Sequence, residues 1–267
     1  MDQRVFNSFR TLVYRMSGIA LGEGKQALVS ARIAKRMRAL GIDDYGVYLD
    51  YIFEDKTGQE VTRLIDVIST NVTSFFRDSD QFEFLSQAVS EWLAGGERRF
   101  RIWSAASSSG EEPYSIGMIL LEILQGFHAD VKILATDIST NMLDRCRSGE
   151  YPWDRLRDLP WNLRDRYFDS GTDGGAGIYR VKPELKERIV FRRLNLATPP
   201  FPMKGPFDAV FCRNVMIYFD DVVRDKLVSE VYRLLKTGGY LFVGHAESLT
   251  GIASDFEMVV PSIFRKV

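Results

Sequence analysis

Two adjacent glutamates stand in the loop after the first predicted strand. The segment from Ser104 to Ser115 has small residues and Gly110 after an apolar run, and Glu111 and Glu112 stand directly before Pro113. Pro113 suits the first turn of a helix, whose free backbone N–H groups attract anions. The two carboxylates would repel a phosphate there, and the glycine patterns of dinucleotide and ATP sites are absent from the sequence. We therefore expect a cationic or phosphate-free ligand, unless both glutamates only favour the helix dipole from solvent.

Polar residues also follow three further predicted strands. Asp137 comes directly after an apolar run, where an acid commonly accepts ribose hydroxyls, although capping the next helix explains it equally well. Asn195 and Leu196 offer an amide for the edge of an adenine and an apolar side chain for its face. Arg213 and Asn214 are costly to bury unless paired, so they line a cleft or tie neighbouring loops together.

The stretch from Ile68 to Asp78 joins the two halves of the chain. Five hydroxyl or amide side chains stand beside Phe75, Phe76 and Arg77. Such a mixture suits the wall of a cleft, whereas composition alone favours a capped linker between domains.

The first eighty residues read as helices only. Apolar residues recur there at spacings of three and four, which predicts a small helical bundle. Its segment from Lys25 to Leu40 carries basic residues and no acid, and Arg32, Lys35 and Arg36 fall on one helical face. That face either complements an acidic helical partner or is an ordinary solvated surface.

Strands and helices alternate after a linking helix over residues 82–93. We predict strands at 100–105, 131–136, 189–194, 207–212 and 240–244, with helices at 113–125, 139–146 and 221–236. The last of these helices is expected to stop at Gly238-Gly239. This alternation predicts an α/β fold whose parallel sheet binds ligands beyond the carboxyl ends of its strands. Residues 168–181 are glycine-rich, and residues 258–267 are expected to form a terminal antiparallel strand.

Composition removes several classes of function. The 35 basic and 36 acidic residues nearly cancel, which argues against a nucleic-acid surface. No apolar run approaches the roughly 18 residues of a membrane span. Cys146 and Cys212 read as core residues and support neither a disulfide framework nor a metal site. With no secretory signal in the sequence, we expect a cytoplasmic protein.

Taken together, the motifs resemble the chemotaxis receptor glutamate methyltransferases, the CheR family. This resemblance implies an all-α domain at residues 1–78 and a Rossmann-like S-adenosylmethionine methyltransferase domain with a mostly parallel sheet at 79–267, which carries a small antiparallel β insert at about 165–190. The sequence departs from the family at Ser109, where a threonine is common, and at Ala246, where a serine is common. The matching runs are Ser69–Arg77, Gly110–Ser115, Ala135–Ile138, Cys212–Phe219 and Gly239–Ser248.

The resemblance also implies a role for each site residue, with Arg77 and Tyr218 catalytic and no metal. The cofactor would be S-adenosylmethionine, and the product S-adenosylhomocysteine. By residue, Asn71, Thr73 and Arg77 would lie in the cofactor cleft, Glu111 would face the methionine portion, Asp137 would hold the ribose, Asn195 and Leu196 would flank the adenine, Arg213 and Asn214 would close the pocket, and Tyr218 would lie near the methyl group.

The implied activity is methylation of glutamate side chains on the cytoplasmic helical bundle of bacterial chemoreceptors. In some members of the family, a receptor's C-terminal peptide docks on the β insert. Neither nucleic acid nor membrane insertion is expected. Two alternatives stay open: a methyltransferase acting on another protein or a small molecule, and a module that senses the cofactor without turnover.

Overall fold

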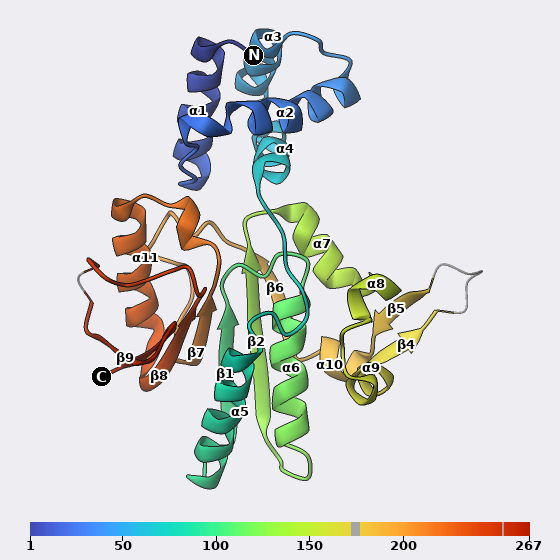
Figure 1. Ribbon diagram of the computed structural model, residues 1–267, viewed down its shortest axis with the longest axis vertical. Coiled ribbons are helices and arrows are strands. Elements are labelled where there is room, and N and C mark those ends of the chain that lie inside the picture. Colours follow the sequence, from blue (N-terminus) through green and yellow to red (C-terminus); the bar gives the residue numbers. More distant parts are fainter. Residues whose placement is uncertain (172–176, 253) are drawn as a thin grey trace.

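The computed structural model describes residues 1–171, 177–252 and 254–267. Its first four long helices form a separate bundle above the rest of the chain (Figure 1). Phe6, Phe9, Ile33, Tyr48 and Leu64 are fully buried in the core of this bundle. The N-caps Asp2 and Asp44 accept backbone N–H groups, and Gly18 and Gly41 end two helices in the left-handed conformation, so local sequence sets these boundaries. The helices are α1 (Gln3–Ser17), α2 (Gln26–Leu40), α3 (Tyr45–Glu54) and α4 (Gln59–Ile68).

Two of the three predicted basic side chains of α2 hold this bundle together. Arg36 donates from Nε and Nη2 to the two carboxylate oxygens of Glu60, at 2.9 and 2.6 Å, and the Tyr48 hydroxyl donates to the same carboxylate at 2.7 Å. Burial raises the pKa of Glu60, but these bonds outweigh it and leave the pKa below its usual value. Arg32 donates to the carbonyl oxygens of Ile68 and Ser69. The expectation of one open basic face is therefore wrong for Arg32 and Arg36.

A seven-stranded sheet forms the centre of the remaining chain. Four neighbouring pairs are parallel, and β10 runs antiparallel to both β8 and β9, which confirms a mostly parallel sheet. In spatial order the strands are β6 (Ile189–Arg193), β2 (Asp130–Asp137), β1 (Arg99–Ser104), β7 (Phe207–Cys212), β8 (Leu235–Val243), β10 (Ile263–Lys266) and β9 (Phe256–Val260).

Helices cover both faces of this sheet. Alternate residues of a strand point to opposite faces, so Ile102 and Trp103 lie in different cores. The core of Ile102 includes α5 (Ser79–Ala94), α6 (Glu111–Ile123) and the buried Leu143 of α7 (Thr140–Ser148). The core of Trp103 is covered by α11 (Asp221–Leu234).

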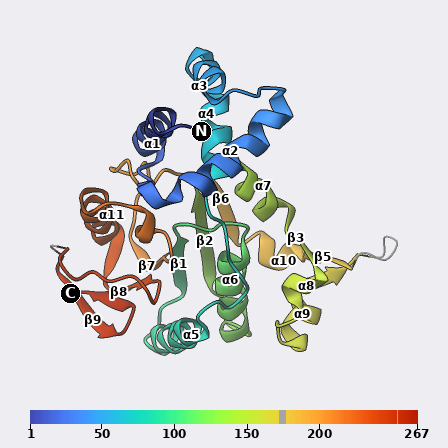
Figure 2. The same cartoon turned by 45° about the horizontal axis from the view of Figure 1, so that its top comes forward.

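A small antiparallel sheet projects from the side of the domain (Figures 1 and 2). Its strands β3 (Glu150–Pro152), β5 (Ile178–Val181) and β4 (Phe168–Ser170) are ordered as written, with α8 (Trp153–Leu156), α9 (Trp161–Tyr167) and α10 (Pro183–Lys186) around them. The sheet thus starts before the predicted segment 165–190, because β3 joins it from residues 150–152. Part of the glycine-rich stretch, residues 172–176, lies outside the described residues.

At the C-terminal end, the predicted helix stop is wrong, whereas the predicted antiparallel pairing is confirmed but is made by two strands instead of one. Gly238 and Gly239 lie inside β8, and α11 already ends at Leu234. A Cβ at Gly239 would meet the Asp208 carbonyl oxygen at 2.8 Å, so this glycine permits close strand contact rather than stopping a helix. The final segment forms two strands, because Ser262 adopts a left-handed turn with φ of 66° between them. Within the described ranges, no helix has the length and apolar character needed to cross a bilayer.

The Arg36 and Lys35 side chains give a matched pair for testing the bundle. Arg36→Glu puts a second carboxylate beside buried Glu60 and is expected to lower the free energy of unfolding by about 3 kcal/mol. Lys35 is exposed, so Lys35→Glu should change the free energy of unfolding by less than about 0.5 kcal/mol. Urea titrations of both variants measure the difference, and equal effects would contradict the assigned role of the Arg36–Glu60 pair.

Candidate functional site

A cavity lies where the helical bundle meets the carboxyl ends of the parallel strands. Loops after β1, β2, β6 and β7 form one wall, and α2 with the segment after α4 forms the other. Figure 2 shows the bundle in front of this edge of the sheet. Nine of the ten predicted site residues line the cavity: Asn71, Thr73, Arg77, Asp137, Asn195, Leu196, Arg213, Asn214 and Tyr218.

Asp137 ends β2 and presents a buried carboxylate to the cavity. One oxygen accepts the backbone N–H of Ser108 and the other accepts that of Ser139, both at 2.8 Å. Burial raises the pKa of Asp137 to about 6, although these two backbone hydrogen bonds oppose the rise. Ser139 is the N-cap of α7 and accepts the N–H of Met142, so helix capping does not account for Asp137.

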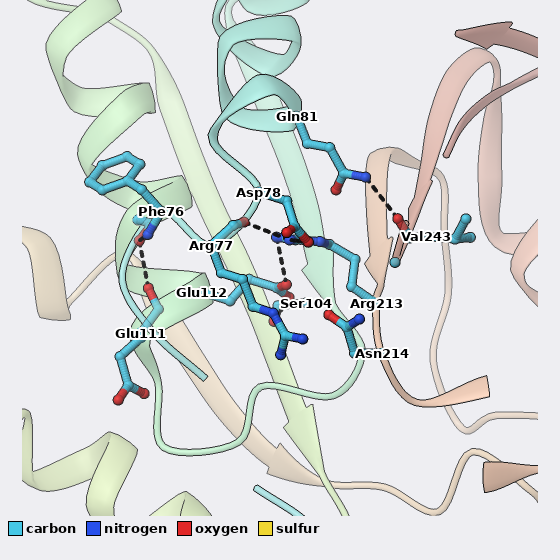
Figure 3. A network of polar contacts seen from close by, with 12 residues as sticks. Phe76, Arg77, Asp78, Gln81, Ser104, Glu111, Glu112, Arg213, Asn214 and Val243 are labelled. Atoms are coloured by element: carbon cyan, nitrogen blue, oxygen red, sulfur yellow. Dashed lines mark hydrogen bonds and ion pairs between the residues drawn. The ribbon is translucent and has the colours of Figure 1, made fainter. Parts of the chain in front are cut away.

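The two glutamates of the first loop have different surroundings. Glu111 is fully buried, accepts the hydroxyl of Ser109 at 2.6 Å and lies 3.5 Å from Arg155. Figure 3 shows the Glu111 carboxylate pointing away from Arg213. Of the two glutamates, Glu112 is among the described residues that line the cavity, and Glu111 is not. The explanation that both face solvent is wrong.

Glu112 is the carboxylate that this loop presents to the cavity. It accepts the Ser104 hydroxyl at 2.7 Å and Arg213 Nη1 at 3.3 Å. Burial raises the pKa of Glu112, while the charges of Arg213 and Arg77 act in the opposite direction. Successive residues in a helix point about 100° apart, so the sequence signal of two adjacent acids could not tell which one faces the ligand.

Arg213 is a buried residue in the wall of the cavity, and Figure 3 shows its side chain beside Asp78. Its side chain is 2% exposed, and Nη2 donates to Asp78 Oδ2 at 2.5 Å and to the carbonyl oxygen of Arg77 at 2.6 Å. Phe76 and Asp78, on either side of Arg77, have φ values of 51° and 59°. The left-handed region costs roughly 1–2 kcal/mol for a residue with a side chain. The Arg213 bonds therefore hold the turn that presents Arg77.

The helical bundle contacts the cavity at Asn195 and at Tyr218. The Asn195 amide donates to the Met16 carbonyl at 3.0 Å and accepts the N–H of Ala197 at 3.0 Å, so it also serves the domain contact. The carbonyl of Tyr218 accepts the N–H of Ala20 at 2.8 Å, and the Lys25 ammonium lies 5.6 Å from the centre of the Tyr218 ring.

Several residues that line the cavity are not among the site residues predicted from the sequence. Ser108, Ile138, Leu194 and Arg32 line it along with the predicted residues. Arg32 comes from the basic run of α2, where nothing distinguished it from its neighbours. In the part of the chain that the structure describes, no cluster of acidic, histidine and cysteine residues could hold a metal ion.

Both parts of the chain match known families. Residues 4–69 match the CheR methyltransferase all-alpha domain, and residues 71–264 match the CheR methyltransferase SAM binding domain. Chemotaxis protein methyltransferase 2 of Pseudomonas aeruginosa is 40% identical over 91% of this chain and 86% of its own. Chemotaxis protein methyltransferase 1 of the same organism is 41% identical over 95% and 93%. Chemotaxis protein methyltransferase of Salmonella typhimurium is 38% identical over 95% and 86%. The chain belongs to the CheR methyltransferase family, whose cofactor is S-adenosylmethionine.

Proposed function

We propose that this methyltransferase forms glutamate methyl esters on the cytoplasmic helical domain of bacterial chemoreceptors. The observation that carries the proposal is the cavity at the strand ends, where Asp137 and Glu112 face the space that Arg77 and Tyr218 also line. The names of the relatives, chemotaxis protein methyltransferases, support the receptor as acceptor and a place of action in the cytoplasm.

The side chains of the cavity fit S-adenosylmethionine. Asp137 has the position of an acid that accepts the two ribose hydroxyls, and Ile138 with Leu196 offers apolar contact to an adenine. A carboxylate compensates for the positive charges of the methionine portion. We assign this role to Glu112, which lines the cavity. Glu111 is not one of the described residues that line it, so Glu112 takes its place.

The reaction is an in-line displacement in which a glutamate oxygen attacks a methyl carbon and a neutral thioether leaves. When bound, the cofactor supplies a methyl group on a sulfonium. The substrate carboxylate is already ionised near neutral pH, so no residue has to act as a base. Arg77 orients that carboxylate, together with Tyr218. Opposite charges are lost together in the transition state, so exclusion of water by the helical bundle and alignment of the atoms supply most of the acceleration.

The receptor would be recognised by two further surfaces. Lys35 and Arg38 of α2 are exposed and suit an acidic helical bundle. The receptor's C-terminal peptide would add to the β insert, because β3 and β4 each pair only with β5 in the described chain and leave outer edges for an extended peptide.

Arg77→Ala tests the proposed catalytic arrangement. With labelled cofactor and receptor, the wild type should form base-labile methyl esters on glutamates, and the variant should lose about tenfold or more of kcat/KM because one positioned charged contact is gone. Arg99→Ala, an exposed arginine at the opposite end of β1, is the control and should keep its rate. A wild-type rate for Arg77→Ala refutes the role of Arg77, and cofactor binding without transfer to any acceptor favours the sensing module.

Cofactor affinity should depend on pH through Asp137. The ribose hydroxyls need the ionised carboxylate, and the pKa of Asp137 in the free protein is raised to about 6. Below the pKa of Asp137, the carboxyl must lose its proton before the cofactor can bind. The affinity for the cofactor should therefore fall by about tenfold for each pH unit below this pKa and stay constant above it. Calorimetry from pH 5 to 8 measures this. Asp137→Asn should bind more weakly with a flatter profile, and an unchanged profile would refute the assignment.

Charge reversal on α2 tests receptor docking. Lys35→Glu with Arg38→Glu should weaken receptor capture and make it less salt-sensitive, because screened attraction between the two surfaces is removed. The control variant Lys56→Glu with Lys226→Glu makes the same change in net charge at two other exposed positions. Equal salt responses in both double variants would leave α2 as an ordinary solvated face.

A further inference from the structure

Four backbone N–H groups converge on the carboxylate of Glu247, in the loop after β8. Oε2 accepts from Gly244 at 2.6 Å and from Asn214 at 2.8 Å. Oε1 accepts from Met216 at 2.8 Å and from Ile217 at 3.3 Å. A carboxylate offers about four acceptor positions, so this one is fully occupied by the donors of two loops.

The loops are closely fitted around this carboxylate. Glu247 is buried, and a Cβ at Gly244 would lie 2.8 Å from Glu247 Oε2 and 2.5 Å from Asn214 Nδ2. No ion pair to Glu247 is found among the described side chains, so the amide dipoles compensate its charge. This arrangement depends on an anion with two equivalent oxygens.

Three of the four donors belong to the loop that carries Tyr218. Asn214 adopts a left-handed φ of 56°, and Met216 begins the short turn that ends at Tyr218. Asn214, Val215 and Tyr218 line the cavity, whereas Glu247 is not among its described lining residues. Glu247 therefore acts on the cavity through the backbone that it binds, and its charge also helps to raise the pKa of Glu112.

We propose that Glu247 is a positioning residue for methyl transfer, which sets the place of Tyr218 through the amides of Asn214, Met216 and Ile217. This inference rests on the proposed function, in which Tyr218 lies near the transferred methyl group. Asp137, Leu196 and Ile138 come from other loops, so the nucleoside end of the cofactor is held independently of Glu247.

The variant Glu247→Gln removes one of the two carboxylate oxygens with little change in shape. Its NH₂ group faces two backbone N–H donors, so two of the four bonds are lost. We expect kcat to fall about tenfold or more while KM for the cofactor changes by less than about threefold, because an interaction needed for the reaction geometry is removed. Amide exchange measured by NMR should rise at Asn214, Met216 or Ile217.

The matched control is Glu230→Gln. Glu230 is also a buried carboxylate that accepts a backbone N–H, from Phe201 at 2.7 Å, and it is absent from the described lining of the cavity. This variant should keep the wild-type kcat. An equal fall in kcat for both variants would show a general effect on folding and would overturn the proposal.

A double-mutant cycle with Tyr218→Phe separates positioning from a structural role. If Glu247 acts through Tyr218, then Glu247→Gln should lower kcat by less than about twofold in the Tyr218→Phe background. Full additivity, or a wild-type kcat for Glu247→Gln alone, overturns the inference. If the wild type itself forms no glutamate esters, the proposed function fails instead, and the amide exchange still reports whether Glu247 holds the loop.

Discussion

The geometry of the site depends on a guanidinium buried between carboxylates. Arg213 follows β7, Asp78 precedes α5 and Glu112 lies in the first turn of α6, so their ion pairs join three separate segments. Removing one member of such a buried set leaves an uncompensated charge, which is strongly destabilising. The same guanidinium holds the carbonyl of Arg77, so the buried pairs that fix the fold also fix the arginine that faces the cavity.

The helical bundle completes the cavity and is tied to its rim by polar contacts. The Tyr14 hydroxyl donates to Asp220 at 2.5 Å, and Arg63 donates to Asn141 at 3.1 Å. Asp220 is also the N-cap of α11, so a local helix signal and a domain contact share one carboxylate. Bonds of this kind place the bundle over the strand ends, where the proposed reaction between opposite charges needs water to be excluded.

Periodicity and motif order predict the five mutually parallel strands of the sheet and most of the cavity. Arg213 stands out because a polar residue directly after a buried strand is costly without a partner, whereas Asp137 and Asn195 stand out for the ribose and adenine contacts that their side chains could make. The remaining features depend on contacts between residues that are far apart in the sequence, so they could not be predicted from local patterns. In the sequence Arg32 and Arg36 read as part of an open basic face, either for a partner or for solvent, but Ile68 and Glu60 lie beside them. Gly238-Gly239 reads as a helix stop, although strand pairing takes those residues into β8. The roles of Glu112 and Glu247 required side-chain directions that the sequence does not contain.

The proposed binding of S-adenosylmethionine rests on the carboxylates of Asp137 and Glu112, which line this cavity. A crystal structure with S-adenosylhomocysteine tests it most directly. We expect the ribose hydroxyls on the Asp137 carboxylate, the adenine beside Leu196 and the methionine portion facing Glu112. Density for the ligand away from these side chains, or a nucleotide phosphate bound at Gly110, would contradict it.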